Sequence, residues 1–144
     1  MKKATILTVM IIASKLCFSQ VFAGLNLGSS HAGLSAGIES NNVAVTVAMN
    51  HSYYKTEVPS YYSMQVGYIY HFTEENSFVI GGHAGYAYAK SKVIKDNVVD
   101  KELNEMKGVY TLEAGKNMHT GRLSLTCSYL SSRLYYGVSI KCFF

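Results

Sequence analysis

The sequence predicts an all-β fold, an eight-stranded antiparallel transmembrane β-barrel of the up-and-down meander type. Three observations predict it. Eight segments alternate between two kinds of residue with a period of two, which is the side-chain period of a strand. Short turn-forming stretches separate these segments. One face of most segments is rich in Val, Leu, Ile, Tyr, Phe and Met, and the other is rich in Gly, Ser, Thr and Ala.

The amino terminus predicts a secretory signal peptide over residues 1–19. Two lysines after the first methionine precede an apolar run from Ala4 to Ser14, which is the usual signal-peptide pattern. This run is shorter than the ~20 apolar residues that a membrane-spanning helix needs. Cleavage after Ser19 and cleavage after Ala23 both fit the sequence. We expect the first, because the alternation begins directly after it, and residues 20–144 would then form the barrel domain.

The charge of the chain argues against a nucleic-acid partner. The formal net charge of +4 comes largely from Lys2, Lys3 and Lys15, which lie within the predicted signal peptide. The mature chain is therefore close to neutral. It has no basic run interleaved with aromatics and no glycine-rich phosphate loop, which are the patterns typical of nucleic-acid and nucleotide sites.

Four strands are expected in the first half of the mature chain. Their ranges are 20–27, 32–39, 43–50 and 62–72. A tight turn is expected over 28–31. Asn41-Asn42 predicts a two-residue hairpin turn, because Asn tolerates positive φ. A loop is expected over 51–60, where Pro59 would end any strand pairing.

Four more strands are expected in the second half. Their ranges are 78–88, 110–115, 122–129 and 133–144. Residues 74–76 and 118–119 are expected to be turns, and Ser131-Ser132 predicts a two-residue hairpin turn. Residues 89–106 carry interspersed charges without apolar alternation, and they predict one long loop.

The two faces and the turns together predict a barrel in a membrane. A soluble barrel, the alternative, would turn its apolar face inward. Here the charged residues share the face of small residues, which suits an eight-stranded lumen filled by side chains. Strands in lipid must also pair at every edge, which requires closure. An even number of strands puts both termini at one end, together with the turns at Asn41, Glu75 and Met118. At the other end the connections at Ser29 and Ser131 are short, so only the loops 51–60 and 89–106 would project.

The last strand has an apolar face that ends on an aromatic residue, as in the closing strands of bacterial outer-membrane barrels. The spacing that resembles the assembly signal of those strands is carried by Gly137, Ile140, Cys142 and Phe144. This resemblance implies that the barrel-assembly machinery is a partner of the chain.

More of the chain resembles the OmpX/Ail/Lom family of small eight-stranded outer-membrane proteins. The resemblance rests on residues 61–67, 70–72, 78–86, 123–129 and 136–144. It implies a place in the bacterial outer membrane at the cell surface, among outer-membrane lipid, and we expect a monomer. Family members are described as adhesins, invasion factors, complement-resistance proteins or phage-encoded surface proteins. The resemblance therefore implies adhesion to a host or extracellular protein, a virulence-associated role. The chain departs from the family in its short first and last loops.

Four charged residues are expected on the lumen face. They are Glu39, Glu113, Arg122 and Lys141. With the turns as predicted, Arg122 lies opposite Lys141 and diagonal to Glu113. Unpaired buried charges are costly, so the acids and bases should pair. The network either fixes the barrel as a plug or forms a proton or ion path, and we expect the plug.

Two sets of residues are expected to make surface contacts. Tyrosine is favoured at interfaces, and the first set, around the loop 51–60, is Tyr53, Tyr54 and Tyr61. These tyrosines could equally lie at the membrane interface. Exposed aliphatic residues in a charged loop suggest a binding patch, and the second set is Val93, Ile94, Val98 and Val99. The sequence therefore predicts surface interaction through two extracellular loops, with an envelope-structural barrel without a ligand as the alternative.

The sequence predicts no enzyme, no cofactor and no metal site. An enzyme that edits lipid A would need a nucleophile, a base and a carboxylate at the outer rim. The one candidate cluster there is His51, Ser52 and Glu57, which makes a lipid-modifying enzyme a distant alternative. His83 is expected to be a hydrogen-bonded lumen residue. Cys127 and Cys142 would lie ~20 Å apart along the last hairpin, beyond the reach of a disulfide.

Overall fold

The computed structural model describes residues 20–53, 60–72, 77–95 and 98–144, without the side chains of residues 91–103. The predicted signal peptide lies outside the described residues. The strands are β1 (Gln20–Gly28), β2 (His31–Ser40), β3 (Val43–Ser52), β4 (Ser60–His71), β5 (Phe78–Lys95), β6 (Val98–Met118), β7 (Gly121–Leu130) and β8 (Arg133–Phe143). None of the described residues belongs to a helix long and apolar enough to cross a membrane.

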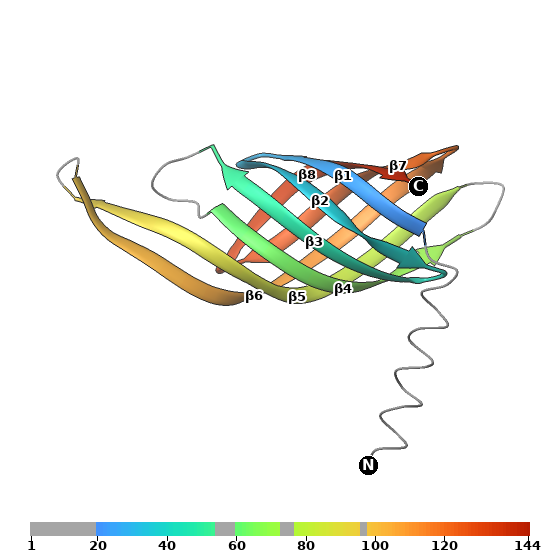
Figure 1. The fold of residues 1–144 in the computed structure, drawn as a ribbon. Coiled ribbons are helices and arrows are strands. Elements are labelled where there is room, and N and C mark those ends of the chain that lie inside the picture. Colours follow the sequence, from blue (N-terminus) through green and yellow to red (C-terminus); the bar gives the residue numbers. More distant parts are fainter. Residues whose placement is uncertain (1–19, 54–59, 73–76, 96–97) are drawn as a thin grey trace, which may run out of the picture.

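The strands form a closed barrel. Each strand pairs antiparallel with the next, and β1 also pairs with β8, for example Leu25 with Ile140 (Figure 1). The predicted eight-stranded antiparallel meander is therefore confirmed. The start of β1 and the end of β8 lie at one end of the barrel, which we call the terminus end. The β5–β6 hairpin projects from the opposite end, which we call the hairpin end.

Two tight turns have the geometry that the sequence predicts. Ser131 and Ser132 have φ values of 54° and 64°, in the left-handed region that two-residue hairpin turns favour. This turn sets Tyr129 opposite Leu134, so the apolar faces of β7 and β8 coincide. Asn41, in the turn between β2 and β3, has a φ of 51°.

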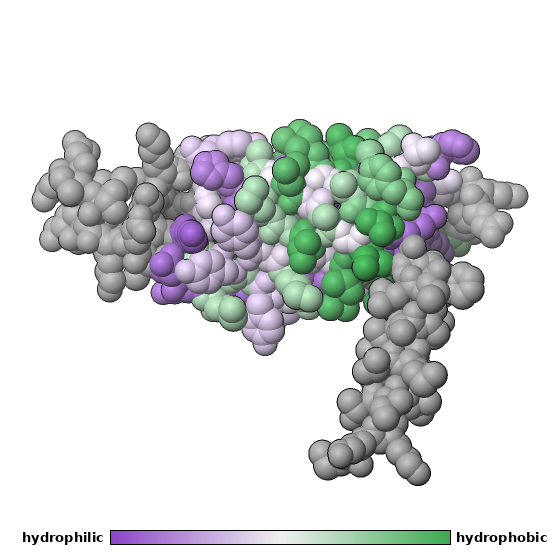
Figure 2. Space-filling view, viewed as in Figure 1, coloured by the Kyte–Doolittle hydropathy of each residue, from purple (hydrophilic) through white to green (hydrophobic). Residues whose placement is uncertain are grey.

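The outward face of the barrel is apolar. Large side chains such as Leu112, Leu125 and Tyr86 are 67%, 68% and 69% exposed. Figure 2 shows apolar residues gathered over the middle of the visible face and hydrophilic residues toward both ends. Because a soluble barrel turns its apolar side chains inward, this arrangement is the one expected for a barrel surrounded by lipid.

The lumen holds two buried apolar clusters, one near each end of the barrel. At the hairpin end, one buried cluster contains Tyr61, Ala87, Ala89, Val109, Leu130 and Tyr135. At the terminus end, a second buried cluster contains Ala44, Ile69 and Val79. Buried polar residues between these clusters include Ser35, Ser63, Gln65, His83, Glu113 and Lys141. Glu39 and Arg122 lie at the level of the second cluster, since Glu39 pairs with Ala44 and Arg122 bonds to Glu39.

The prediction of one long loop over 89–106 is wrong. β5 continues to Lys95 and β6 begins at Val98, and the two strands stay paired along this extension, with a bulge between Val93 and Ile94. Apolar alternation marks a strand with one buried face. A hairpin that leaves the barrel has no core to cover, so its strands lack the pattern on which the prediction relied.

The extension forms a two-stranded ribbon beyond the barrel. The pairing of β4 with β5 ends at Lys90, and the pairing of β6 with β7 begins at Val109. Among the described residues, 91–95 therefore pair only with β6, and 98–108 pair only with β5. We call these two segments the ribbon (Figure 1).

Candidate functional site

Arg122 and Glu39 form a buried ion pair across the lumen. Arg122 on β7 donates from Nη1 to Glu39 Oε2 at 2.9 Å and from Nη2 to Oε1 at 2.6 Å. A planar guanidinium fits a carboxylate well in this two-bond arrangement. Its Nε–H donates to Asn117 Oδ1 at 2.7 Å, and the group lies 5.3 Å from the centroid of the Phe143 ring. Since Arg122 is 1% exposed, its charge depends on Glu39 for compensation.

Glu113 and Lys141 form a second buried pair. Lys141 Nζ donates to Glu113 Oε2 at 2.6 Å, and Ser124 Oγ donates to Oε1 at 2.7 Å. His83 Nε2 lies 3.1 Å from Glu113 Oε2. Arg122 Nη1 lies 3.8 Å from Glu113 Oε1 and links the two pairs. Two acids and two bases thus balance each other in the lumen, and we call Glu39, Glu113, Arg122 and Lys141 the lumen charge network.

The structure brings the four predicted lumen residues together but pairs them differently. Arg122 lies opposite Lys141 in the β7–β8 register, as expected. Its closest carboxylate is that of Glu39 on β2 rather than the diagonal Glu113. The Glu39 contact crosses the lumen, so it depends on the closure and stagger of the whole barrel. The pairing of neighbouring strands therefore does not predict the contact between Arg122 and Glu39.

A polar cavity of about 90 Å³ lies beside the lumen charge network. Several buried atoms around it have no hydrogen-bond partner in the described part of the chain. They include Ser35 Oγ, Thr46 Oγ1, Gln65 Oε1, His83 Nδ1 and Ser139 Oγ. Buried polar groups in proteins are usually satisfied by protein atoms or by water. A cavity with this lining suits water or very small polar solutes.

The predicted rim cluster is not assembled as expected. His51 and Ser52 are neighbours on β3, so they point to opposite faces, His51 outward and Ser52 inward. Glu57 lies outside the described residues. His51 Nδ1 instead lies 3.3 Å from Ser60 Oγ, which accepts a hydrogen bond from the Ser52 N–H at 3.0 Å. Ser60 was missed because its approach to His51 follows from the β3–β4 hairpin.

The predicted surface tyrosines separate. Tyr53 is 54% exposed, and Tyr54 lies outside the described residues. Tyr61 is buried at 7% exposure and packs edge-to-face on His31, with ring centroids 5.2 Å apart. Because the side chain of Tyr61 points into the lumen, the prediction that it contacts a partner is wrong. The second set is Val93, Ile94, Val98 and Val99. These residues belong to the two strands of the ribbon, and the structure does not describe their side chains.

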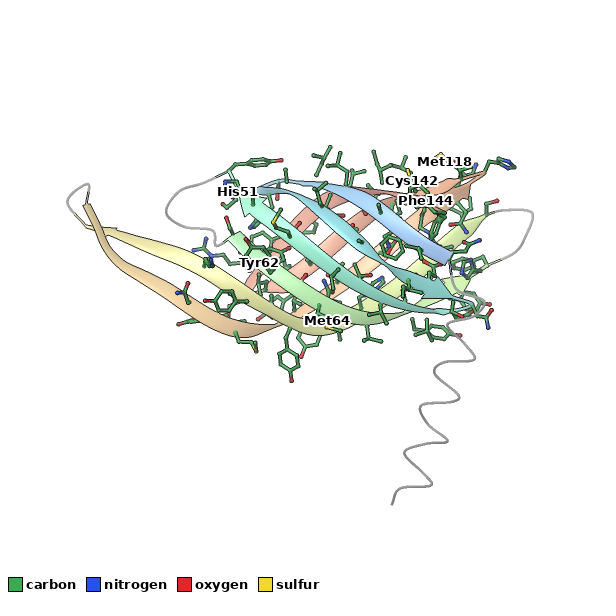
Figure 3. All side chains as sticks on the ribbon, in the orientation of Figure 1. His51, Tyr62, Met64, Met118, Cys142 and Phe144 are labelled. Atoms are coloured by element: carbon green, nitrogen blue, oxygen red, sulfur yellow. The ribbon has the colours of Figure 1, made fainter. Side chains whose placement is uncertain are left out.

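The residues of the predicted assembly signal lie on two faces of β8. Ile140, Cys142 and Phe144 point outward, and Figure 3 shows Cys142 and Phe144 at the terminus end. Gly137 is on the lumen face. A Cβ at Gly137 would lie 2.7 Å from the Leu27 carbonyl oxygen, so its glycine allows β8 to approach β1 closely where the barrel closes.

The remaining chemistry-bearing residues are dispersed. Cys127 pairs with Tyr136 and Cys142 with Gly121 in the β7–β8 register, which places the two cysteines far apart, and both are free. Within the described ranges, no group of three or more His, Cys, Asp or Glu side chains is placed to hold a metal ion.

Comparisons with known proteins support the fold alone. No protein-family model and no curated protein sequence matches the chain. The N-terminal β-barrel domain of Pseudomonas aeruginosa OprF is similar in structure, with a TM-score of 0.60 and 15% identity over 88% of this chain and 96% of that one. Neisserial surface protein A (NspA) has a TM-score of 0.54 and 14% identity over the same shares. The resemblance to the OmpX/Ail/Lom family stays a prediction.

Proposed function

We propose that this chain is an integral β-barrel of the bacterial outer membrane that binds an extracellular protein through the ribbon. The apolar outward face supports the membrane location, because large side chains of this kind are stable in lipid and costly in water. The likeness to the barrels of OprF and NspA agrees with this location. The polar lumen agrees too, since lumen and lipid faces alternate along each strand of such barrels.

The orientation follows from the lengths of the connections. Both termini lie at the terminus end, and every connection there is short, whereas the longest connection leaves the hairpin end. Single-chain outer-membrane barrels face the periplasm with their short turns. The ribbon leaves the hairpin end, so we place it outside the cell (Figure 1). Lys90, at the base of the ribbon, lies 5.9 Å from the ring centroids of both Tyr62 and Tyr88. Tyrosine and lysine in this combination are typical of the level of lipid headgroups.

The observation that carries the proposal is the pair of open strand edges on the ribbon. Residues 91–95 of β5 and 98–108 of β6 have no third strand beside them in the described part of the chain. Open edges can pair with an added strand, and extended peptides bind many proteins in this way. An isolated two-stranded hairpin is only marginally stable in water. A partner strand would therefore stabilise the ribbon as it binds.

Replacement of residues 91–105 by a short Gly-Ser turn tests this proposal. The change removes the open edges except at residues 106–108, and it leaves every β4–β5 pair up to Lys90 and the β6–β7 pairs from Val109 intact. We expect normal insertion and loss of adhesion or serum-factor binding by cells that display the variant. A matched control replaces Ser131-Ser132, in a turn at the same end, by Asn-Gly, and it should keep both properties. Unchanged binding without the ribbon would refute this function.

An envelope-structural barrel is the second candidate. It is supported by the lumen charge network, in which each carboxylate is paired with a cation. It predicts that loss of the ribbon has no phenotype while disruption of the network weakens the envelope. We expect no enzymatic activity. Because His51 lies beside the Ser60 hydroxyl, this expectation should be checked by comparing lipid A from cells with and without the gene.

A further inference from the structure

An apolar groove lies on the outward face of β5, β6 and β7 near the terminus end. It has a volume of about 680 Å³. Its floor is Ala114 on β6, which pairs with Ile80 on β5 and with Leu125 on β7. Both neighbours are large and exposed, at 51% and 68%. A small side chain between two large ones leaves a channel over Ala114, between Ile80 and Leu125.

A lysine stands at the terminus end of this groove. Lys116 is the next outward residue after Ala114 on β6, and it pairs with Phe78 and Leu123, whose side chains continue the two walls. Its Nζ lies 5.7 Å from the centroid of the Phe78 ring. Among the described residues that face outward at this end, Lys116 is the one with a charged side chain. The groove is thus apolar along its length and cationic at its mouth.

We infer that the groove binds one anionic glycerophospholipid of the periplasmic leaflet. An acyl chain lies along Ala114, and the phosphate meets the Lys116 ammonium. The inference rests on the proposed membrane location, which puts the terminus end and Lys116 at the level of the periplasmic headgroups. A lysine there can extend its charged end to the interface while its aliphatic part stays on apolar surface. Basic residues beside an apolar pocket are a common way to hold an acidic lipid headgroup.

The charge and the groove make separate contributions, so two variants test them separately. Lys116→Gln keeps the groove and removes the charge, and we expect about five-fold weaker retention of phosphatidylglycerol, the effect of one lysine near a lipid phosphate. Ala114→Leu fills the channel while adding an apolar side chain to an apolar outward face. It should remove the bound lipid whatever its headgroup.

Two control variants match these changes elsewhere on the outward face. Lys90→Gln removes the lysine that lies beside Tyr62 and Tyr88 at the hairpin end. Ala36→Leu enlarges an outward alanine of β2. Both should retain phosphatidylglycerol as the unchanged protein does.

The measurement is native mass spectrometry of the mature protein folded in micelles with either phosphatidylglycerol or phosphatidylcholine. We expect a one-lipid complex that survives higher collision energy with phosphatidylglycerol, and loss of that preference in Lys116→Gln. Equal retention of the two lipids, or a stable complex in Ala114→Leu, would overturn the inference.

A gel shift on heating reports the folding of each variant, and insertion into vesicles of the same lipids reports the membrane location. A barrel that inserts but shows no lipid preference contradicts the groove site alone. A chain that folds in water and does not insert contradicts the proposed function, and the lipid site with it.

Discussion

Arg122 on β7 and Glu39 on β2 face each other across the lumen and are joined by two hydrogen bonds of 2.6 and 2.9 Å. The second pair, Glu113 and Lys141, is joined at 2.6 Å. Only the 3.8 Å contact between Arg122 and Glu113 connects them directly. Each carboxylate therefore has one principal cation, and the two pairs should respond to mutation as separate units.

Glu113→Ala should destabilise the barrel by about 3–5 kcal/mol, because it leaves the Lys141 ammonium buried without its carboxylate. Lys141→Met in the same chain should recover most of this loss, whereas Arg122→Met should not, since Glu39 would then lose its partner. Urea unfolding of the protein in lipid vesicles measures the free energies. Better recovery with Arg122→Met than with Lys141→Met would contradict the pairing.

Gly67→Ala should also destabilise the barrel. Gly67 pairs with His83 in the β4–β5 register, and a Cβ at position 67 would overlap the imidazole ring. The ring would have to leave its position 3.1 Å from Glu113 Oε2, at a cost of about 1–3 kcal/mol.

Gly82→Ala is the matched control for this effect. Gly82 is an outward glycine on β5, where a Cβ would lie 3.8 Å from Leu112 Cδ2, an ordinary contact. We expect its unfolding free energy to stay within about 0.5 kcal/mol of the original, as for most surface changes. Equal losses in the two variants would mean that glycine matters for backbone conformation rather than for space beside His83.

Deletion of Phe144 should lower the amount of inserted barrel and increase degradation in the periplasm. Phe144 donates its backbone N–H to the Val21 carbonyl at 2.9 Å, and its ring is 81% exposed on the outward face. Phe144→Ala keeps the backbone bond and removes only the ring. If the ring is what the assembly machinery recognises, both variants should give a weak heat-modifiable band. If both give the normal band, Phe144 is no part of an assembly signal.

Much of the barrel could be predicted because alternation is a local property of the chain. The outward and inward faces of β7 and β8 and the turn at Ser131-Ser132 follow from residues within one hairpin, and the structure reproduces them. The presence of Glu39, Glu113, Arg122 and Lys141 on the inward face follows in the same way.

The features that were missed depend on longer distances or on a different environment. The partner of Arg122 is set by the stagger with which β1 closes on β8, and no pattern within a single hairpin carries that information. The strands of the ribbon were predicted as a loop because a ribbon outside the barrel has no core to cover and so lacks apolar alternation. A signal was present in the β-branched residues near its tip, Val93, Ile94, Val98 and Val99, which favour strands. Tyr61 was misplaced because its neighbouring loop suggested the surface, while its parity with Ser63 points inward.

The most direct test of the central claim is protease treatment of intact cells that carry the protein. The account places the ribbon outside the cell and the rest of the barrel in the outer membrane. Trypsin has possible cleavage sites in or beside the ribbon at Lys92, Lys95 and Lys101. We expect cleavage there in intact cells, with two fragments that stay together in the outer-membrane fraction until denatured. Cleavage at these sites only after the outer membrane has been opened, or recovery of the protein in the soluble fraction, would contradict the account.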